Sequence, residues 1–170
     1  MKIAVLSDIH DNIWNLEKVL EKLKNEIVDA IIFCGDFCAP FTFKRLADVG
    51  LPIYAVFGNV DGAQAEITHE ALKDYKDITL KKDLLTLELD KRRIAICHND
   101  KFAESMAITG KYNAVFYGHT HQLKVENINK TLLVNPGEVH GHTGRCSFGI
   151  YDTKKNEIKI IEIKWIVWKK

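Results

Sequence analysis

Short apolar runs separated by amphipathic segments dominate the first half of the chain. Because these runs are continuous in aliphatic and aromatic residues and end at polar residues or glycine, they predict buried strands. The runs are Met1–Ser7, Asp29–Cys34, Pro52–Phe57, Arg93–Cys97 and Asn113–Tyr117. After the first run, apolar residues recur at helical spacing from Asn12 to about Asn25, and Asn12 can serve as the N-cap of this helix.

Further elements follow from the same pattern. Three more helices are predicted, at Phe41–Val49, Ala63–Tyr75 and Phe102–Thr109. After Lys82 the character changes, and the residues from Leu84 to Cys97 form two runs that predict a hairpin turning near Lys91. Short predicted strands alternate with turns in the remainder: Leu123–Glu126, Thr131–Val134, Ser147–Tyr151 and Glu157–Val167.

The order of elements indicates an α/β fold. The first half reads as βαβαβ, and the second half as mostly antiparallel strands, which two sheets packed face to face with helices outside can accommodate. In the last strand the apolar phase changes at Ile160-Ile161, which predicts a β-bulge. Trp165 and Trp168 lie at opposite parities, so one is predicted to pack in the core and the other in a contact between copies of a homo-oligomer.

Composition limits the classes of function. The 170 residues fit one domain spanning 1–170, and 46% hydrophobic residues suffice for a core. A net charge of +1 and only short basic spots argue against non-specific nucleic-acid binding or a membrane partner. No signal-peptide pattern or long apolar stretch is visible, so a cytoplasmic location is expected. The four cysteines, including Cys34 and Cys38 around Asp36, are interpreted as small buried residues rather than metal ligands.

Side chains suited to metal binding follow the predicted strands. The clusters are Asp8-Ile9-His10, Gly35-Asp36, Gly58-Asn59, His98 and Gly118-His119-Thr120-His121. Since the carboxyl ends of strands in an α/β sheet lie along one edge, these segments could deliver two Asp, one Asn and four His to one place. That mixture of oxygen and imidazole donors suits transition metals better than calcium or a thiolate zinc site.

Local geometry adds detail to this expectation. If the backbone is extended there, Asp8 and His10 point the same way and can bind one ion, and His119 and His121 can face one cavity. Asp36 has two carboxylate oxygens and could bridge two ions. The neighbouring glycines would allow sharp turns and close approach of the backbone. Two divalent ions against two carboxylates leave a charge of about +2, which would attract a phosphate.

Taken in order, these motifs resemble those of the calcineurin-like metallophosphoesterase family. D-x-H, G-D, G-N-x-D, a strand-ending His, and G-H-T-H followed by N-P-G run from Asp8 to Gly137. The chain is similar to the small single-domain phosphodiesterases of bacteria and archaea in this family. The resemblance implies a four-layer α-β-β-α sandwich of two mixed sheets flanked by helices.

The resemblance also implies a binuclear metal centre. One ion would be held by Asp8, His10, Asp36 and His121, and the second by Asp36, Asn59, His98 and His119. A metal-bridging hydroxide, held by the bridging ligand Asp36, would attack a phosphodiester whose phosphate Asn59 contacts. Manganese is the first choice for both ions, and nickel, iron, cobalt and zinc accept the same donors.

The chain departs from the family pattern at two positions. Val60 stands where many members have a histidine, and Asn99-Asp100 follows His98 where many have Gly-His. General-acid assistance is worth about 10²–10⁴-fold, so diesters with acidic leaving groups are the favoured substrates. His140 and His142 are candidate acids, although a surface-loop role is the preferred interpretation for both.

Three functions fit the sequence. The first is a phosphodiesterase for small or nucleotide-like phosphodiesters. No large cap insertion is present to enclose a particular substrate, so an open site with loose selectivity is expected. The second is a phosphomonoesterase or nucleoside-polyphosphate hydrolase. The third is a non-catalytic protein-binding scaffold, as in the retromer subunit that has this fold, but the retention of all seven ligand-type residues argues against it.

Overall fold

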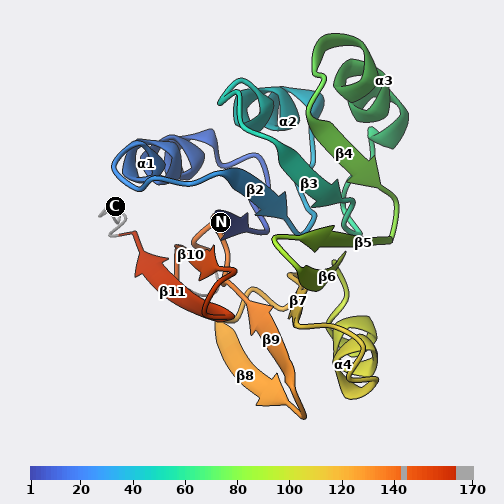
Figure 1. The fold of residues 1–170 in the computed structure, drawn as a ribbon. Helices are drawn as coiled ribbons and strands as arrows, with labels where there is room; N and C mark the ends of the chain where they lie inside the picture. Colours follow the sequence, from blue (N-terminus) through green and yellow to red (C-terminus); the bar gives the residue numbers. More distant parts are fainter. Residues whose placement is uncertain (143–144, 164–170) are drawn as a thin grey trace.

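Two mixed β-sheets face each other in the computed structural model, which describes residues 1–142 and 145–163 (Figure 1). The six-stranded sheet contains, in spatial order, β11 (Glu157–Glu162), β10 (Ser147–Asp152), β1 (Lys2–Leu6), β2 (Ala30–Phe33), β3 (Ile53–Val56) and β4 (Ile78–Lys81). The five-stranded sheet contains β5 (Leu84–Leu89), β6 (Arg92–Cys97), β7 (Ala114–Phe116), β9 (Thr131–Asn135) and β8 (Lys124–Ile128).

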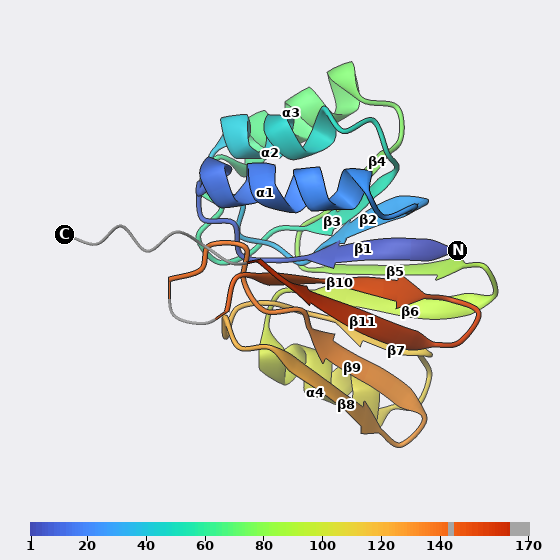
Figure 2. The same ribbon diagram turned by 90° about the vertical axis from the view of Figure 1, so that its left-hand side faces the viewer.

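Helices cover the outer face of each sheet (Figure 2). The six-stranded sheet carries α1 (Ile13–Lys24), α2 (Pro40–Ala47) and α3 (Gln64–Asp74), and the five-stranded sheet carries α4 (Asp100–Ile108). This arrangement confirms the predicted four-layer sandwich. β1 to β4 are parallel, as are β6, β7 and β9, so the carboxyl ends of each group share one edge.

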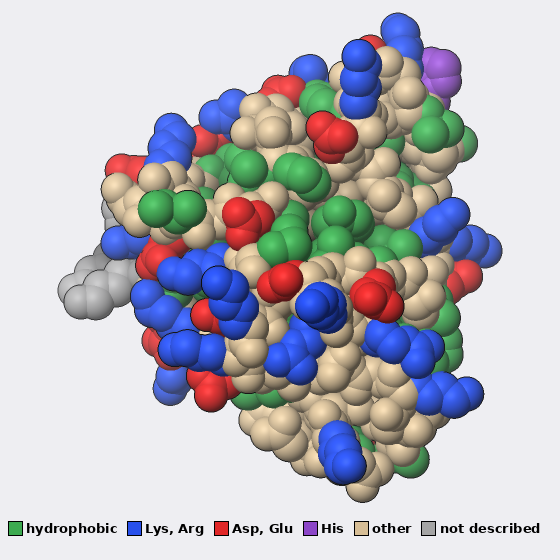
Figure 3. All heavy atoms as spheres, in the orientation of Figure 1, with side chains coloured by type: hydrophobic (Ala, Val, Ile, Leu, Met, Phe, Trp, Pro, Cys, Tyr) green, Lys and Arg blue, Asp and Glu red, His purple; other side chains and the backbone are tan. Residues whose placement is uncertain are grey.

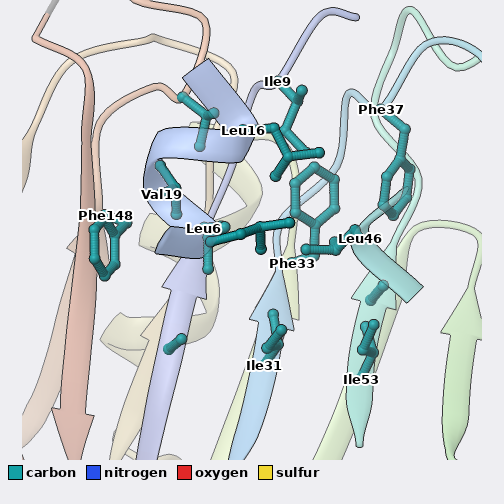
Figure 4. Close-up of a cluster of buried hydrophobic side chains, with 14 of the residues drawn as sticks. Leu6, Ile9, Leu16, Val19, Ile31, Phe33, Phe37, Leu46, Ile53 and Phe148 are labelled. Atoms are coloured by element: carbon teal, nitrogen blue, oxygen red, sulfur yellow. The ribbon is translucent and has the colours of Figure 1, made fainter. Parts of the chain in front are cut away.

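Apolar side chains fill all three spaces between the layers. In β1, Ile3 and Val5 pack between the sheets, whereas Ala4 and Leu6 pack under the helices. Because both faces of the strand are buried, its sequence is a continuous apolar run rather than an alternating one. Figure 4 shows the layer under the helices, where Leu6 meets residues of α1 and the neighbouring strands. On α4, the small buried residues Ala103 and Ala107 allow the helix to pack closely on the five-stranded sheet.

The predicted helices are confirmed to within a few residues. The Oδ1 atom of Asn12 accepts a hydrogen bond from the backbone N–H of Asn15 at 3.1 Å, so the predicted N-cap of α1 is present. The hairpin between β5 and β6 turns at Asp90 and Lys91, whose φ angles are 48° and 64°. The edge strand β4 was not predicted, because its half-exposed residues give no strong apolar pattern.

The predicted bulge in the last strand is wrong. β10 and β11 pair without interruption from Ser147–Glu162 to Asp152–Glu157. Ile158 packs between the sheets, and Ile161 packs toward the helical layer. The change in apolar alternation at Ile160-Ile161 therefore reflects burial on both faces of a regular strand, not a bulge. Trp165, Trp168 and the predicted extension of the strand to Val167 lie outside the described residues.

The surface gives two further observations. On the face shown in Figure 3, basic and acidic side chains are interspersed over the elements of both sheets. In the ranges 1–142 and 145–163, no helix is long and apolar enough to cross a membrane.

Candidate metal centre

The loops that follow β1, β2 and β7 bring four predicted ligands together. Asp8, His10, Asp36 and His121 each offer a ligand atom, and these atoms all lie within 4.8 Å of one another. The Nε2 atoms of His10 and His121 are 3.1 Å apart. His10 Nε2 is 3.4 Å from Asp36 Oδ2, and His121 Nε2 is 3.5 Å from Asp8 Oδ1. We call these four residues the first ligand group.

The remaining three predicted ligands lie on the other side of Asp36. His98 Nε2 is 3.2 Å from Asp36 Oδ2 and 2.9 Å from Asn59 Oδ1. The same Asn59 oxygen is 2.8 Å from His119 Nδ1. We call Asp36, Asn59, His98 and His119 the second ligand group. The structure thus places all seven predicted residues in one connected cluster, with Asp36 within reach of both groups.

Burial differs across the cluster, and charge interactions within it are strong. Asp8, Asp36 and His98 are buried, whereas Asn59 and His119 are exposed. Burial by itself lowers the pKa of His98, but the hydrogen bond and negative charge of Asp36 outweigh it and raise that pKa. Burial raises the pKa of Asp36, yet hydrogen bonding to His98 and the charge of His98 lower it overall. The carboxylates therefore favour a cation between them, and the oxygen and imidazole donors fit a divalent transition metal.

Five of the seven residues adopt left-handed backbone conformations. Their φ angles are Asp8 54°, His10 46°, Asp36 65°, His119 69° and His121 59°. Such conformations cost of order 1–3 kcal/mol each and persist only where the surrounding structure fixes them. The extended geometry predicted for the two i, i+2 pairs is therefore wrong. Asp8 and His10 still meet in the first group, but His119 and His121 contact different groups.

Glycines permit the close approaches that were predicted. A Cβ added to Gly58 would lie 2.0 Å from Asp36 Oδ1, and one added to Gly118 would lie 2.6 Å from Asp8 Oδ2. At Gly35 a Cβ would lie 2.7 Å from His98 Nδ1, and its φ of 99° is itself unfavourable for other residues. The three glycines thus let the loops pack directly against ligand side chains.

Asp61 supports the cluster in a way that the sequence analysis did not identify. Its Oδ2 accepts hydrogen bonds from the backbone N–H of Asp36 at 3.0 Å and of Gly58 at 2.7 Å. Its Oδ1 accepts from Cys38 N–H at 2.7 Å. The buried carboxylate therefore joins the loop after β2 to the loop after β3. The sequence signal that could have identified Asp61 is its position as the last residue of the G-N-x-D motif.

Two ligand histidines have partners at their second ring nitrogen. His121 Nδ1 is 2.5 Å from Oε2 of the buried Glu138, a residue that no motif singled out. His98 Nδ1 donates to the carbonyl oxygen of Cys34 at 2.8 Å. Such partners orient a ligand histidine and select the tautomer that presents the other nitrogen to a metal. In both residues the presented atom is Nε2.

Cys34 and Cys38, which flank Asp36, do not belong to the groups of described side chains whose ligand atoms lie close together. Burial raises the pKa of Cys34 far above its usual value. Burial and the charge of Asp11 raise that of Cys38 to about 12. Cys38 Sγ lies 3.7 Å from His10 Nδ1, so it contacts the second nitrogen of that ring instead. The interpretation as buried small residues holds for Cys34, whereas Cys38 is half-buried.

The histidines outside the motifs occupy different positions. His140 lies half-buried in the loop that precedes β10, and its ring centroid is 5.2 Å from that of His10, so this loop residue adjoins the cluster. His142 is exposed and stacks on His140 at 5.4 Å. Burial and the charge of His10 lower the pKa of His140.

A cavity of about 260 Å³ adjoins the second ligand group. Besides three of those ligands, it is lined by Phe57, Gly58, Asp83, Asn99 and Phe102. Phe102 is 40% exposed and gives the cavity an aromatic wall. A larger cavity, of about 830 Å³, lies between α1 and α2 and contains none of the ligand residues.

Comparisons with known proteins identify the family of the chain. The family described as the calcineurin-like phosphoesterase superfamily domain matches residues 1–156. Phosphodiesterase MJ0936 of Methanocaldococcus jannaschii is 36% identical over 167 residues, covering 96% of this chain and 100% of the relative. Phosphodiesterase YfcE of Escherichia coli K12 is 27% identical over 168 residues, covering 89% and 88%.

Solved structures give the same picture. The structure of an archaeal phosphodiesterase matches with a TM-score of 0.86 and 33% identity, covering 96% of this chain and 100% of the other. Vps29 of Chaetomium thermophilum matches with a TM-score of 0.71 and 14% identity, covering 96% and 95%, which shows a shared fold alone.

Together the fold, the cluster and these matches define an enzyme that hydrolyses phosphate esters. The chain belongs to the calcineurin-like phosphoesterase superfamily, as the order of its motifs had predicted.

Proposed function

We propose that this chain is a binuclear-metal phosphodiesterase that hydrolyses small or nucleotide-like phosphodiesters. The position of Asp36 is the main support for this proposal. Its Oδ2 lies 3.4 Å from His10 Nε2 in the first group and 3.2 Å from His98 Nε2 in the second. A carboxylate between two sets of imidazoles can offer one oxygen to each of two neighbouring divalent ions, which is the arrangement of a two-metal site.

Each ligand group would hold one ion. The first group would do so with two carboxylates and two imidazoles, and the second with the shared Asp36, the Asn59 amide oxygen and two imidazoles. When bound, such ions lower the pKa of water and neutralise the charge of phosphoryl oxygens. Manganese is the first choice, and nickel, iron, cobalt and zinc fit the same donors.

The chain's own residues would bind and orient the substrate. Asn59 is exposed, and its Oδ1 faces His98 and His119. Its Nδ2 group would therefore donate a hydrogen bond to a phosphoryl oxygen of a diester placed over the second group. Asp36 would hold the attacking water in position, while Asp61 fixes the two loops that carry Asp36 and Asn59.

The cavity beside the second group indicates where an ester group of the substrate binds. Its volume of about 260 Å³ is below the range of roughly 300–1,000 Å³ typical for whole drug-sized ligands, so it suits a single ring system. Among the lining residues, Phe102 would offer an aromatic ring on which a planar group can stack, and Asp83 would offer a carboxylate as a hydrogen-bond acceptor. These features favour nucleotide-like diesters. Two relatives that carry the name phosphodiesterase support the same class.

Hydrolysis of two model esters tests the proposal. Bis-p-nitrophenyl phosphate and p-nitrophenyl phosphate are compared after chelation and re-addition of Mn²⁺, Ni²⁺, Co²⁺ or Zn²⁺, with bound metal measured in parallel. Metal-dependent turnover that favours the diester is expected. Turnover of the monoester alone would replace the proposal by a phosphomonoesterase, and bound metal without any turnover would favour a scaffold.

A further inference from the structure

His140 extends the first ligand group toward a third histidine. A ring nitrogen of His10, of His121 and of His140 lies within 4.8 Å of each of the other two. The ring centroid of His140 is 5.2 Å from that of His10 and 6.5 Å from that of His121. Because His10 and His121 belong both to this set and to the first ligand group, the imidazole of His140 adjoins the first ligand group.

The backbone of His140 is fixed by buried polar contacts. Its N–H donates to the carbonyl oxygen of Asp8 at 2.8 Å, which ties it directly to a ligand residue. Its carbonyl oxygen accepts from Asn12 Nδ2 and from Asn15 Nδ2, each at 2.9 Å. Asn15 is only 4% exposed, so its side-chain amide makes this hydrogen bond in a buried position and fixes the loop. These bonds use only main-chain atoms of His140 and leave its imidazole available as a ligand.

The loop also carries a second contact to the first group. Glu138, two residues earlier, reaches the Nδ1 atom of His121 with its carboxylate. Glu138 and His140 thus approach the same ligand set, one through the second nitrogen of a ligand histidine and the other through its own ring. This convergence is unexpected for a loop whose only function is to connect two strands.

We propose that His140 is an additional ligand to the metal ion bound by Asp8, His10, Asp36 and His121. The inference rests on the proposed metal centre and assigns it a residue that the family motifs do not contain. Two nitrogen ligands at about 2.1 Å from one ion lie no more than about 4.2 Å apart, and the ring nitrogens of His10, His121 and His140 already lie within 4.8 Å of one another. A third imidazole makes the site more selective for cobalt, nickel or zinc over manganese.

His140 and His142 form a matched pair for the test. The variants His140→Phe and His142→Phe each keep a ring and remove its nitrogens, and only the first residue adjoins the first ligand group. Affinity for Co²⁺ is followed by its visible absorption and affinity for Mn²⁺ by electron paramagnetic resonance, starting from chelated protein. His140→Phe is expected to weaken Co²⁺ binding at the first position by at least about tenfold, and more than Mn²⁺ binding.

Two controls separate coordination from folding and from the proposed function. His140→Ala is expected to show the same loss, and the cobalt-loaded variants should lack one of the hyperfine-shifted imidazole N–H resonances of the unaltered protein. His142→Phe should leave both affinities and all of these resonances unchanged. Equal effects of the two Phe variants, or no effect of either, would overturn the inference alone. Failure of the unaltered protein to bind metal would overturn the proposed metal centre itself.

Discussion

Asp61 offers the sharpest test of how the cluster is supported. This carboxylate is 4% exposed and accepts hydrogen bonds from the backbone N–H groups of Asp36, Gly58 and Cys38. Asp61→Asn preserves the size of the side chain but replaces one acceptor oxygen by an NH₂ donor. At least one buried N–H then faces a donor and loses its partner, and the remaining bonds lose the negative charge that strengthens them.

The magnitude follows from these contacts. An unsatisfied buried donor costs about 1–3 kcal/mol, and a hydrogen bond to a charged group is worth about 1.5–3 kcal/mol, somewhat more than a neutral one. We therefore expect the substitution to lower the free energy of unfolding by about 2–4 kcal/mol. In a domain of this size, 1 kcal/mol shifts Tm by roughly 2–4 °C, which gives a decrease of about 5–15 °C.

Thermal unfolding in the presence of a chelator measures this effect without a contribution from bound metal. Asp152→Asn is the matched control, because Asp152 also accepts from two backbone N–H groups, those of Lys154 and Lys155, but at an exposed turn. Its substitution is expected to change stability by less than about 1 kcal/mol. The reasoning would be refuted by a Tm for Asp61→Asn within about 2 °C of the unaltered protein.

Three other substitutions test single contacts within the cluster. Asp36→Asn is expected to abolish activity and loading of a second metal ion together, and a fully active variant with normal metal content would exclude Asp36 as the bridge. Gly58→Ala would force a Cβ to within 2.0 Å of Asp36 Oδ1 and should disrupt metal binding, whereas Gly62→Ala meets nothing within 4 Å and should be neutral; equal metal affinities for both variants would contradict this. Val60 is 44% exposed, and its N–H donates to Asp36 Oδ1. Val60→His should therefore speed hydrolysis of diesters with poor leaving groups by up to about 10²-fold, and an unchanged rate would show that a missing imidazole is not the limitation.

The positions of the ligands could be predicted because strand ends in parallel sheets share an edge. Five of the predicted ligands follow runs whose apolar residues were sufficient to predict strands: Asp8, Asp36, Asn59, His98 and His121. Parallel pairing of these strands then brings their carboxyl ends to the same edge of each sheet. The local backbone could not be predicted in the same way. Left-handed conformations at ligand residues are imposed by the surrounding loops, which periodicity does not describe.

The supporting residues were harder to identify than the ligands. Glu138 follows a turn motif and carries no spacing that relates it to His121, 17 residues earlier. The position of His140 depends on the amides of Asn12 and Asn15 at the start of α1, a contact between segments more than 120 residues apart. Strand β4 was missed for a related reason, since its residues pack only partly and pair through the backbone with β3. Long-range polar contacts of this kind leave little trace in a single sequence.

Differences in burial between the two ligand groups predict an order of metal binding. In the first group Asp8 is fully buried and Asp36 is 2% exposed, so two desolvated carboxylates face one ion. The second group shares Asp36 and adds the exposed residues Asn59 and His119. Opposite charges attract more strongly where water is excluded, and the first ion also neutralises part of the charge of Asp36.

The first position should therefore bind its ion more tightly than the second, and the more exposed second ion would be the one beside the substrate cavity. A titration of chelated protein with Mn²⁺ is expected to show two phases, with dissociation constants that differ by at least about tenfold, equivalent to 1.4 kcal/mol. Asn59→Ala should weaken only the second phase, because the side-chain oxygen of Asn59 pairs with His98 and His119, which belong to the second group alone. A single phase, or loss of the tighter phase in this variant, would mean that burial does not determine the order of binding.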